Sequence, residues 1–265
     1  MFTLGFVQFC PTRYDVHQNI ATLERLLRGV HADLLVLPEL ANSGYMFAEP
    51  AELLPYSEPG DGSGPFLSAL RRFADEVGGV IVSGFAERSP HGLFNSAAAV
   101  GRTGVLALYR KIHLFADEKG LFLPGDTGFQ VFEHAGARIG LMVCFDWFFP
   151  ESARTLTLLG AQIIAHPANL VLPYCQQAMV TRSLENCVFS VTANRYGQEH
   201  LGDKTLSFTG VSQVLDTKGR RLAQGPEQGD HVAVCEIDPA VADNKWLTST
   251  NHLLNDRRVA LYQLT

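Results

Sequence analysis

The sequence predicts an α/β fold in which helices cover sheets in layers, and three observations lead to this class. Segments with strand character alternate with segments of helical periodicity, and few long gaps separate them. Hairpin signals stand among these βα units, a pattern expected when two sheets face one another. The 265 residues are 46% hydrophobic, ample for one large core, and contain no low-complexity linker or fixed-period repeat. We therefore expect a single domain over residues 1–265.

The first half of the chain alternates strands with helices. Its first helix is predicted from apolar side chains that recur at a spacing close to 3.6, namely Ile20, Leu23, Leu26, Leu27 and Val30. The Gly/Pro-rich stretch "SEPGDGSGP" predicts a loop before the second helix, and "GRTG" at 101–104 predicts a hairpin turn. Strands are predicted at residues 4–9, 33–37, 79–85 and 93–100, and helices at 19–30 and 66–77.

The second half repeats this alternation. Pro150 occupies the position that proline favours at the start of a helix. The turn "DTKGR" separates the last two predicted strands, and the final 25 or so residues, with "KWLTSTNHLLNDRR", form a tail that we expect to pack against another surface. Strands are predicted at residues 138–143, 161–168, 188–194, 207–215 and 231–237, and helices from 150 and over 176–186.

Composition excludes several classes of function. The net charge is −6 with no basic stripe, which argues against a nucleic-acid partner. The N-terminus reads as a first strand rather than a signal peptide, and no apolar run approaches the roughly 20 residues of a membrane helix. The cysteines are odd in number, far apart and without a CxxC pair: Cys10, Cys144, Cys175, Cys187 and Cys235. We therefore expect neither a disulfide framework nor a metal site, and a cytoplasmic protein.

One cysteine occupies an unusual position, in the stretch "ARIGLMVCFDWFFPESARTL". Cys144 ends a predicted buried strand shortly before the helix that begins at Pro150. A free cysteine often packs as a small hydrophobic side chain, so its position alone leaves two interpretations, a core thiol or a nucleophile held at a strand-to-helix turn. We interpret the other cysteines as packing residues, and only Cys175, beside a helix start, as a possible pocket residue.

Three charged residues stand in positions where they could serve such a nucleophile. Glu39, in "LPELANSGY", follows a buried strand, where open α/β sheets place their ligand crevices. Lys111, in "YRKIHLF", ends a strand-like run, and Glu118, in "EKGLFLPGD", precedes a turn. Each has a plainer interpretation, a solvated loop acid or a lysine that extends its stem over apolar surface.

Taken together, the phrases "LPELANSGY", "YRKIHLF", "EKGLFLPGDTGF" and "GLMVCFDWFFPESAR" resemble the nitrilase superfamily of carbon–nitrogen hydrolases over essentially the whole chain. The resemblance implies a four-layer α-β-β-α sandwich that pairs as a homodimer or a higher even oligomer. It also implies a catalytic triad of Glu39, Lys111 and Cys144, with Glu118 as a supporting fourth member. No cofactor and no metal are expected.

The chemistry of amide hydrolysis explains these residue types. A thioester on Cys144 would split a difficult hydrolysis into two easier steps. Glu39 would take the thiol proton, pass it to departing ammonia and later activate water, for which burial should raise its pKa. Lys111 and the backbone N–H of Phe145 would stabilise the oxyanion, and Glu118 would keep Lys111 charged and help orient the amide.

The substrate is less clearly indicated. Nitrilases of the superfamily usually carry Trp-Glu after the cysteine, whereas Phe145-Asp146 here looks more like the amidase side. Neither the arginines that clamp carbamoyl amino acids nor the Tyr-Asp of omega-amidases follows Cys144. Tyr45 and Asn169 are the best pocket candidates, and we interpret the phrase "WFF" at 147–149 as helix packing.

The working hypothesis is thus an amidase for small, largely neutral amides. A nitrilase acting on small aliphatic nitriles and a carbamoyl-amine hydrolase are the alternatives. An intact Glu39, Lys111 and Cys144 argues against a scaffold protein. A cysteine–histidine hydrolase would instead depend on His113 or His166, and a cysteine-ligated metalloenzyme lacks fitting ligand spacing.

Overall fold

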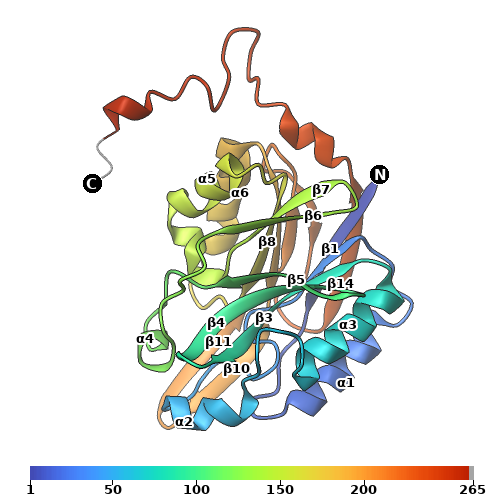
Figure 1. Ribbon diagram of the computed structural model, residues 1–265, viewed down its shortest axis with the longest axis vertical. Helices are drawn as coiled ribbons and strands as arrows, with labels where there is room; N and C mark the ends of the chain where they lie inside the picture. Colours follow the sequence, from blue (N-terminus) through green and yellow to red (C-terminus); the bar gives the residue numbers. More distant parts are fainter. Residues whose placement is uncertain (263–265) are drawn as a thin grey trace.

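Two six-stranded sheets face one another between helices (Figure 1). The structure, a computed structural model, describes residues 1–262. One sheet has the order β14-β1-β2-β3-β4-β5 and the other β13-β12-β9-β8-β7-β6. In each sheet the three central strands run parallel and the outer strands antiparallel, β1, β2 and β3 in the first and β7, β8 and β9 in the second.

The strands of the first sheet are β1 (Phe2–Gln8), β2 (Leu34–Val36), β3 (Val80–Ser89), β4 (Gly92–Gly101), β5 (Gly104–Arg110) and β14 (His231–Ile237). Those of the second are β6 (Gln130–His134), β7 (Ala137–Leu141), β8 (Ile163–Ala168), β9 (Phe189–Asn194), β12 (Gln213–Leu215) and β13 (Arg221–Gln224). A separate hairpin pairs β10 (Tyr196–Leu201) with β11 (Lys204–Thr209).

The helices are α1 (Val16–Leu27), α2 (Pro50–Leu53), α3 (Pro65–Val77), α4 (Glu118–Leu121), α5 (Pro150–Leu158) and α6 (Cys175–Asn186). Short 3₁₀ turns are η1 (Leu54–Tyr56), η2 (Cys144–Phe148), η3 (Pro239–Asp243) and η4 (Val259–Leu261). None of the helices within residues 1–262 is long and apolar enough to cross a membrane.

The layers follow from the alternation of side chains along a buried strand. In β2, Leu34 and Val36 join the core that includes side chains of both sheets, whereas Leu35 packs with the apolar faces of α1 and α3. Helices α5 and α6 lie on the opposite side of the molecule, against the second sheet (Figure 1). The predicted four-layer α-β-β-α sandwich is confirmed.

One predicted strand and one predicted connection need correction. The strand expected over 207–215 is divided into β11 and β12, because Gly210 and Val211 adopt positive φ angles of 59° and 52° that extended backbone does not allow. The turn "DTKGR" joins β12 to the short strand β13, which the sequence did not indicate, rather than to β14. The hairpin at 101–104 and the helix start at Pro150 are as predicted.

The C-terminal tail leaves the sandwich and extends away from it (Figure 1). Its start is anchored, because Lys245 Nζ donates to the carbonyls of Asn186 and Cys187 at the end of α6, at 2.8 and 2.9 Å. Beyond that point, large apolar side chains are exposed, among them Trp246, Leu247 and Leu261. Within residues 1–262 these side chains remain more than half exposed, although Trp246 contacts His252.

Candidate active site

Cys144 lies just past the carboxyl end of β7, where the chain turns into η2. Its φ angle is 41°, a left-handed conformation that residues with a side chain rarely adopt and that is often found at functional sites. His166 Nε2 lies 3.0 Å from the carbonyl oxygen of Cys144 and must donate to it, because a carbonyl only accepts. Burial lowers the pKa of His166 to about 4, so the imidazole is neutral at physiological pH.

Three charged side chains form a closed cluster. Lys111 Nζ lies 2.7 Å from Glu39 Oε1 and 2.8 Å from both carboxylate oxygens of Glu118. Glu39, Lys111 and Glu118 are all buried. Asn95, on β4, donates its side-chain N–H to Glu39 Oε1 at 2.7 Å. The other Glu39 oxygen, Oε2, is buried and has no hydrogen-bond partner within residues 1–262.

The two facing sheets bring these residues together. Glu39 follows β2 and Lys111 follows β5 in one sheet, whereas Cys144 follows β7 in the other. The sheets meet at Glu39, whose backbone carbonyl accepts the side-chain N–H of Asn169 at 2.9 Å. Asn169 comes directly after β8, the parallel neighbour of β7. The candidate site therefore lies at the carboxyl ends of parallel strands, where α/β sheets place their ligands.

Burial and charge set the protonation of the cluster. Burial raises the pKa of Glu39, against the opposing positive charge of Lys111. Burial alone would lower the pKa of Lys111, but the charges of Glu118 and Glu39 outweigh it and raise that pKa. Burial raises the pKa of Cys144 well above its usual range, and the charge of Glu39 adds to the rise. The thiol is therefore protonated at neutral pH, next to an ammonium and two carboxyl groups.

Tyr45 supports this cluster from outside. Its hydroxyl donates to Glu118 Oε1 at 2.7 Å. The loop that carries Tyr45 is itself held by Glu199, whose carboxylate accepts the backbone N–H groups of Tyr45 and Met46. Glu199 forms a buried ion pair with Arg195. Asn95, Arg195 and Glu199 were not predicted from the sequence, because no local pattern links them to residues so distant in the chain.

A shallow hollow of about 10 Å³, room for about one water molecule, adjoins the thiol. It is lined by Cys144 together with Phe115, Phe145, Trp147, Asn169, Leu170, Val171 and Leu172. Phe145 and Asn169 thus line the same hollow as Cys144, whereas Tyr45 lines the neighbouring one together with Glu118. Trp147 is buried in the core, as the packing interpretation of "WFF" expects, although it also lines this hollow. The interpretation is wrong for Phe148, which is 51% exposed. Phe149 stacks on His113.

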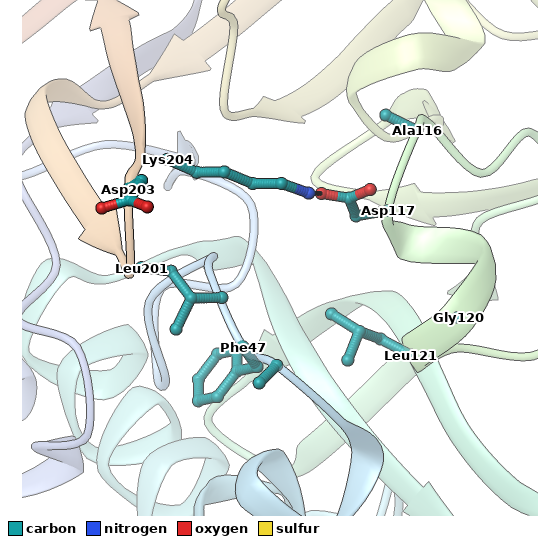
Figure 2. Close-up of a pocket in the computed structure, with 9 residues that line it drawn as sticks. Phe47, Ala116, Asp117, Gly120, Leu121, Leu201, Asp203 and Lys204 are labelled. Atoms are coloured by element: carbon teal, nitrogen blue, oxygen red, sulfur yellow. Dashed lines mark hydrogen bonds and ion pairs between the residues drawn. The ribbon is translucent and has the colours of Figure 1, made fainter.

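A second hollow, of about 80 Å³, shares Phe115 with the first and is also lined by Tyr45 and Glu118. It shares Phe47, Leu121 and other residues with an outer hollow of about 690 Å³ (Figure 2). Figure 2 shows Lys204, from the β10–β11 hairpin, reaching across this outer hollow to Asp117, at 2.9 Å. The hollow beside Cys144 thus borders a second hollow, which in turn shares lining residues with the outer one.

Neither candidate histidine contacts the thiol. His166 bonds to the backbone carbonyl of Cys144, and its Nδ1 lies 3.1 Å from the hydroxyl of Thr192. His113 Nδ1 lies 2.8 Å from a carboxylate oxygen of Asp146. Within residues 1–262, no imidazole hydrogen-bonds to Cys144 Sγ, so this geometry does not favour a cysteine–histidine hydrolase.

The fold and the cluster define an α-β-β-α protein with a buried thiol, ammonium and carboxylates at one site. Comparison with known proteins identifies the family: residues 3–244 match the model of the carbon–nitrogen hydrolases. A protein from Pyrococcus abyssi named nitrilase is 42% identical, over 99% of each chain. The chain belongs to the carbon–nitrogen hydrolase family, and its predicted membership of the nitrilase superfamily is confirmed.

Other relatives show the breadth of this family. N-carbamoylputrescine amidase from Solanum lycopersicum is 32% identical over 100% of this chain and 94% of that protein. The crystal structure of a carbon–nitrogen hydrolase from Helicobacter pylori covers 98% of this chain and 97% of its own, with a TM-score of 0.87 and 24% identity. The crystal structure supports the fold, and the amidase shows that relatives of this chain carry different enzyme names.

Proposed function

We propose that this protein hydrolyses the carbon–nitrogen bond of a small, neutral amide to a carboxylic acid and ammonia, through a thioester on Cys144. One observation carries the proposal: the buried Glu39 Oε2 has no partner within residues 1–262, while Oε1 holds Lys111 and Asn95. A buried, unpartnered carboxylate oxygen is costly, and a general base needs one free to take a proton.

The first half of the reaction forms the thioester. Glu39 takes the proton of Cys144 as Sγ bonds to the amide carbon. This base is needed because a protonated thiol of raised pKa is a weak nucleophile by itself. The negative charge that develops on the carbonyl oxygen is stabilised by Lys111 and by the backbone N–H of Phe145. When the carbon–nitrogen bond breaks, Glu39 gives the proton to nitrogen, and ammonia leaves.

The second half releases the acid. Glu39 takes a proton from water as the water oxygen bonds to the thioester carbon, and the same donors stabilise the second oxyanion. The carbon–sulfur bond then breaks, and the sulfur recovers the proton from Glu39. Each half-reaction thus returns Glu39 to its starting state, so one carboxylate serves as base and acid.

Glu118 acts in this scheme by holding Lys111. Its two oxygens already accept from Lys111, from the hydroxyl of Tyr45 and from the backbone N–H of Phe115. A carboxylate offers about four acceptor positions, so little capacity is left for a substrate N–H. Holding Lys111 therefore has more support than the amide-orienting role that the family resemblance also implied for Glu118.

Asn169 is better placed to orient the amide. Its Oδ1 is buried without a hydrogen-bond partner within residues 1–262, and the residue lines the hollow next to Cys144. An amide nitrogen carries protons that this oxygen can accept, whereas a nitrile nitrogen carries none. The rest of the hollow is apolar and uncharged, which supports a small, neutral acyl group.

Nitrile hydrolysis is the second candidate, and the named nitrilase at 42% identity favours it. The test measures ammonia release from propionamide and propionitrile, with Cys144→Ala as the control that should release none. Release from the amide, lost in that control, supports the proposal. In Asn169→Ala we expect the ratio of amide to nitrile turnover to fall about tenfold, since an unpaired polar partner costs 1–3 kcal/mol. Release from the nitrile alone would contradict the proposal.

We also propose that the protein assembles as a homodimer in a reducing compartment such as the cytoplasm. The outer face of α5 and α6 exposes Leu158, Leu159 and Leu184, and the extended tail exposes further large apolar side chains. Such surface is usually covered by a partner. All five cysteines are free, which suits a reducing compartment. Light scattering after size exclusion tests the assembly, and a monomer would contradict it.

A further inference from the structure

We infer that Asp146 is a positioning residue that sets the placement of Cys144 relative to Lys111. Asp146 is fully buried, two residues after the thiol. Its Oδ2 accepts the backbone N–H of Val143, the residue before Cys144, at 2.8 Å. Asp146 thus fixes the turn that holds the nucleophile in its left-handed conformation.

The same carboxylate also holds the segment that carries Lys111. Oδ2 accepts the hydroxyl of Tyr109 at 2.7 Å, and Oδ1 accepts both the backbone N–H and the Nδ1–H of His113, at 3.3 and 2.8 Å. Tyr109 and His113 stand two residues before and two residues after Lys111. One carboxylate therefore joins the nucleophile turn of one sheet to the lysine segment of the other.

This connection matters because the two groups must meet on the same carbonyl. In the proposed reaction, which this inference deepens, Cys144 attacks the carbon while Lys111 faces the oxygen. A misplacement of about 1 Å can cost about 100-fold in rate, even when every reacting group is present. Rigid support behind the reacting residues is the usual means of holding such geometry.

The plainer alternative is that Asp146 only satisfies buried donors and so contributes to stability. Glu58 offers a matched control, because it is also buried and its carboxylate accepts two backbone N–H groups, from Phe66 at 2.9 Å and Leu67 at 2.7 Å, near the start of α3. An amide side chain keeps only one acceptor oxygen. Hence Asp146→Asn and Glu58→Gln each leave at least one buried backbone N–H without its partner.

The first readout is steady-state ammonia release at a temperature where both variants are folded by circular dichroism. For Asp146→Asn we expect kcat to fall about 30- to 100-fold with KM within about threefold, because the transition state loses alignment while binding is kept. For Glu58→Gln we expect both constants within about threefold of the unsubstituted protein, despite a comparable loss of thermal stability. Equal effects of the two substitutions on kcat would overturn the inference.

A second readout does not require turnover. Propionaldehyde adds reversibly to a thiol: the Sγ–C bond forms as the carbonyl π bond breaks, the thiol proton passes to Glu39, and the resulting oxyanion faces Lys111. Its dissociation constant is measured as protection of Cys144 from iodoacetamide. We expect Asp146→Asn to weaken protection about tenfold or more while alkylation without aldehyde changes less than about threefold, since alkylation needs no oxyanion donor. Glu58→Gln should leave both unchanged.

The two readouts separate this inference from the proposed function. If the unsubstituted protein releases no ammonia from amides, the proposed function fails, and the aldehyde measurement still decides the role of Asp146. Unchanged protection in Asp146→Asn overturns the inference whatever the turnover. Parallel losses of alkylation and protection also overturn it, because they show a damaged thiol rather than a lost alignment with Lys111.

Discussion

Removing the ammonium of the cluster should have two effects with different pH dependence. Lys111→Met keeps the length of the side chain but leaves the buried Glu39 and Glu118 facing one another. Glu39 Oε1 and Glu118 Oε1 both accept a hydrogen bond from Lys111 Nζ, at 2.7 and 2.8 Å, so these two oxygens are at most 5.5 Å apart. In the variant the two carboxylates have no opposite charge between them.

The magnitude follows from these distances. At such a separation, two negative charges repel by about 3 kcal/mol for an effective dielectric constant near 20. Removing one partner of a buried ion pair typically lowers the free energy of unfolding by about 3–5 kcal/mol. Without Lys111 the pKa of Glu39 rises further, because the opposing positive charge is gone. When the pKa of a carboxyl group is higher in the folded state than in the unfolded state, the protein becomes less stable as pH rises. The loss in free energy of unfolding caused by Lys111→Met should therefore be larger at pH 8 than at pH 5.

The assay is urea unfolding at pH 5, 6.5 and 8, with ammonia release measured in parallel. We expect kcat to fall about 100- to 1000-fold, the usual effect of removing one oxyanion donor. Lys245→Met is the control, since Lys245 is also buried but donates to backbone carbonyls. Burial lowers the pKa of Lys245 to about 8, so Lys245 is protonated in both the folded and unfolded states between pH 5 and 6.5. The loss in free energy of unfolding in Lys245→Met should therefore not change over this range, and activity should stay within about threefold. A Lys111→Met deficit that shrinks as pH rises would refute the reasoning.

Three further predictions concern neighbouring residues. In Glu39→Gln, alkylation of Cys144 by iodoacetamide at pH 7 should slow about 100-fold, because the thiol of raised pKa has lost its base. The rate should recover at alkaline pH. An unchanged rate at pH 7 would exclude Glu39 as that base. Tyr45→Phe, which loses the 2.7 Å bond to Glu118, should lower the free energy of unfolding by about 1–2 kcal/mol in a urea titration, and a neutral effect would count against that bond. His166 has a folded pKa of about 4, below its unfolded value, so the unfolded chain binds the proton first and stability should fall by about 3 kcal/mol from pH 7 to 4. His166→Gln should abolish that part of the decline, and an equal decline in the variant would disprove the assignment.

Local pattern was sufficient for most of the fold. Strands such as β2 are buried on both faces and therefore read as continuous apolar runs, and the helices show the spacing of one apolar face. The prediction failed where backbone conformation departs from pattern. Residues 207–215 have the composition of one strand, but the left-handed Gly210 and Val211 divide it. Single residues of this kind leave little trace in periodicity.

The candidate site divides in the same way. Glu39, Lys111, Glu118 and Cys144 could be found from the sequence because each stands in a local phrase at an element's end. Their partners could not, because the contacts join distant parts of the chain: the carboxylate of Glu199 holds the backbone of a residue 154 positions away. No neighbouring residues record such a contact.

The sequence by itself determined which groups are available: a thiol at a strand end, two carboxylates and a lysine, in an alternating α/β chain. Only the tertiary structure decided how they meet. Because the two sheets face one another, Glu39 and Lys111 come from one sheet and Cys144 from the other. Asp146 hydrogen-bonds to residues on both sides, Tyr109 and Val143. Burial between the sheets then changes their pKa values. The physical reason is that desolvation and contact depend on what surrounds a residue in space, whereas propensity and periodicity depend on its neighbours in the chain.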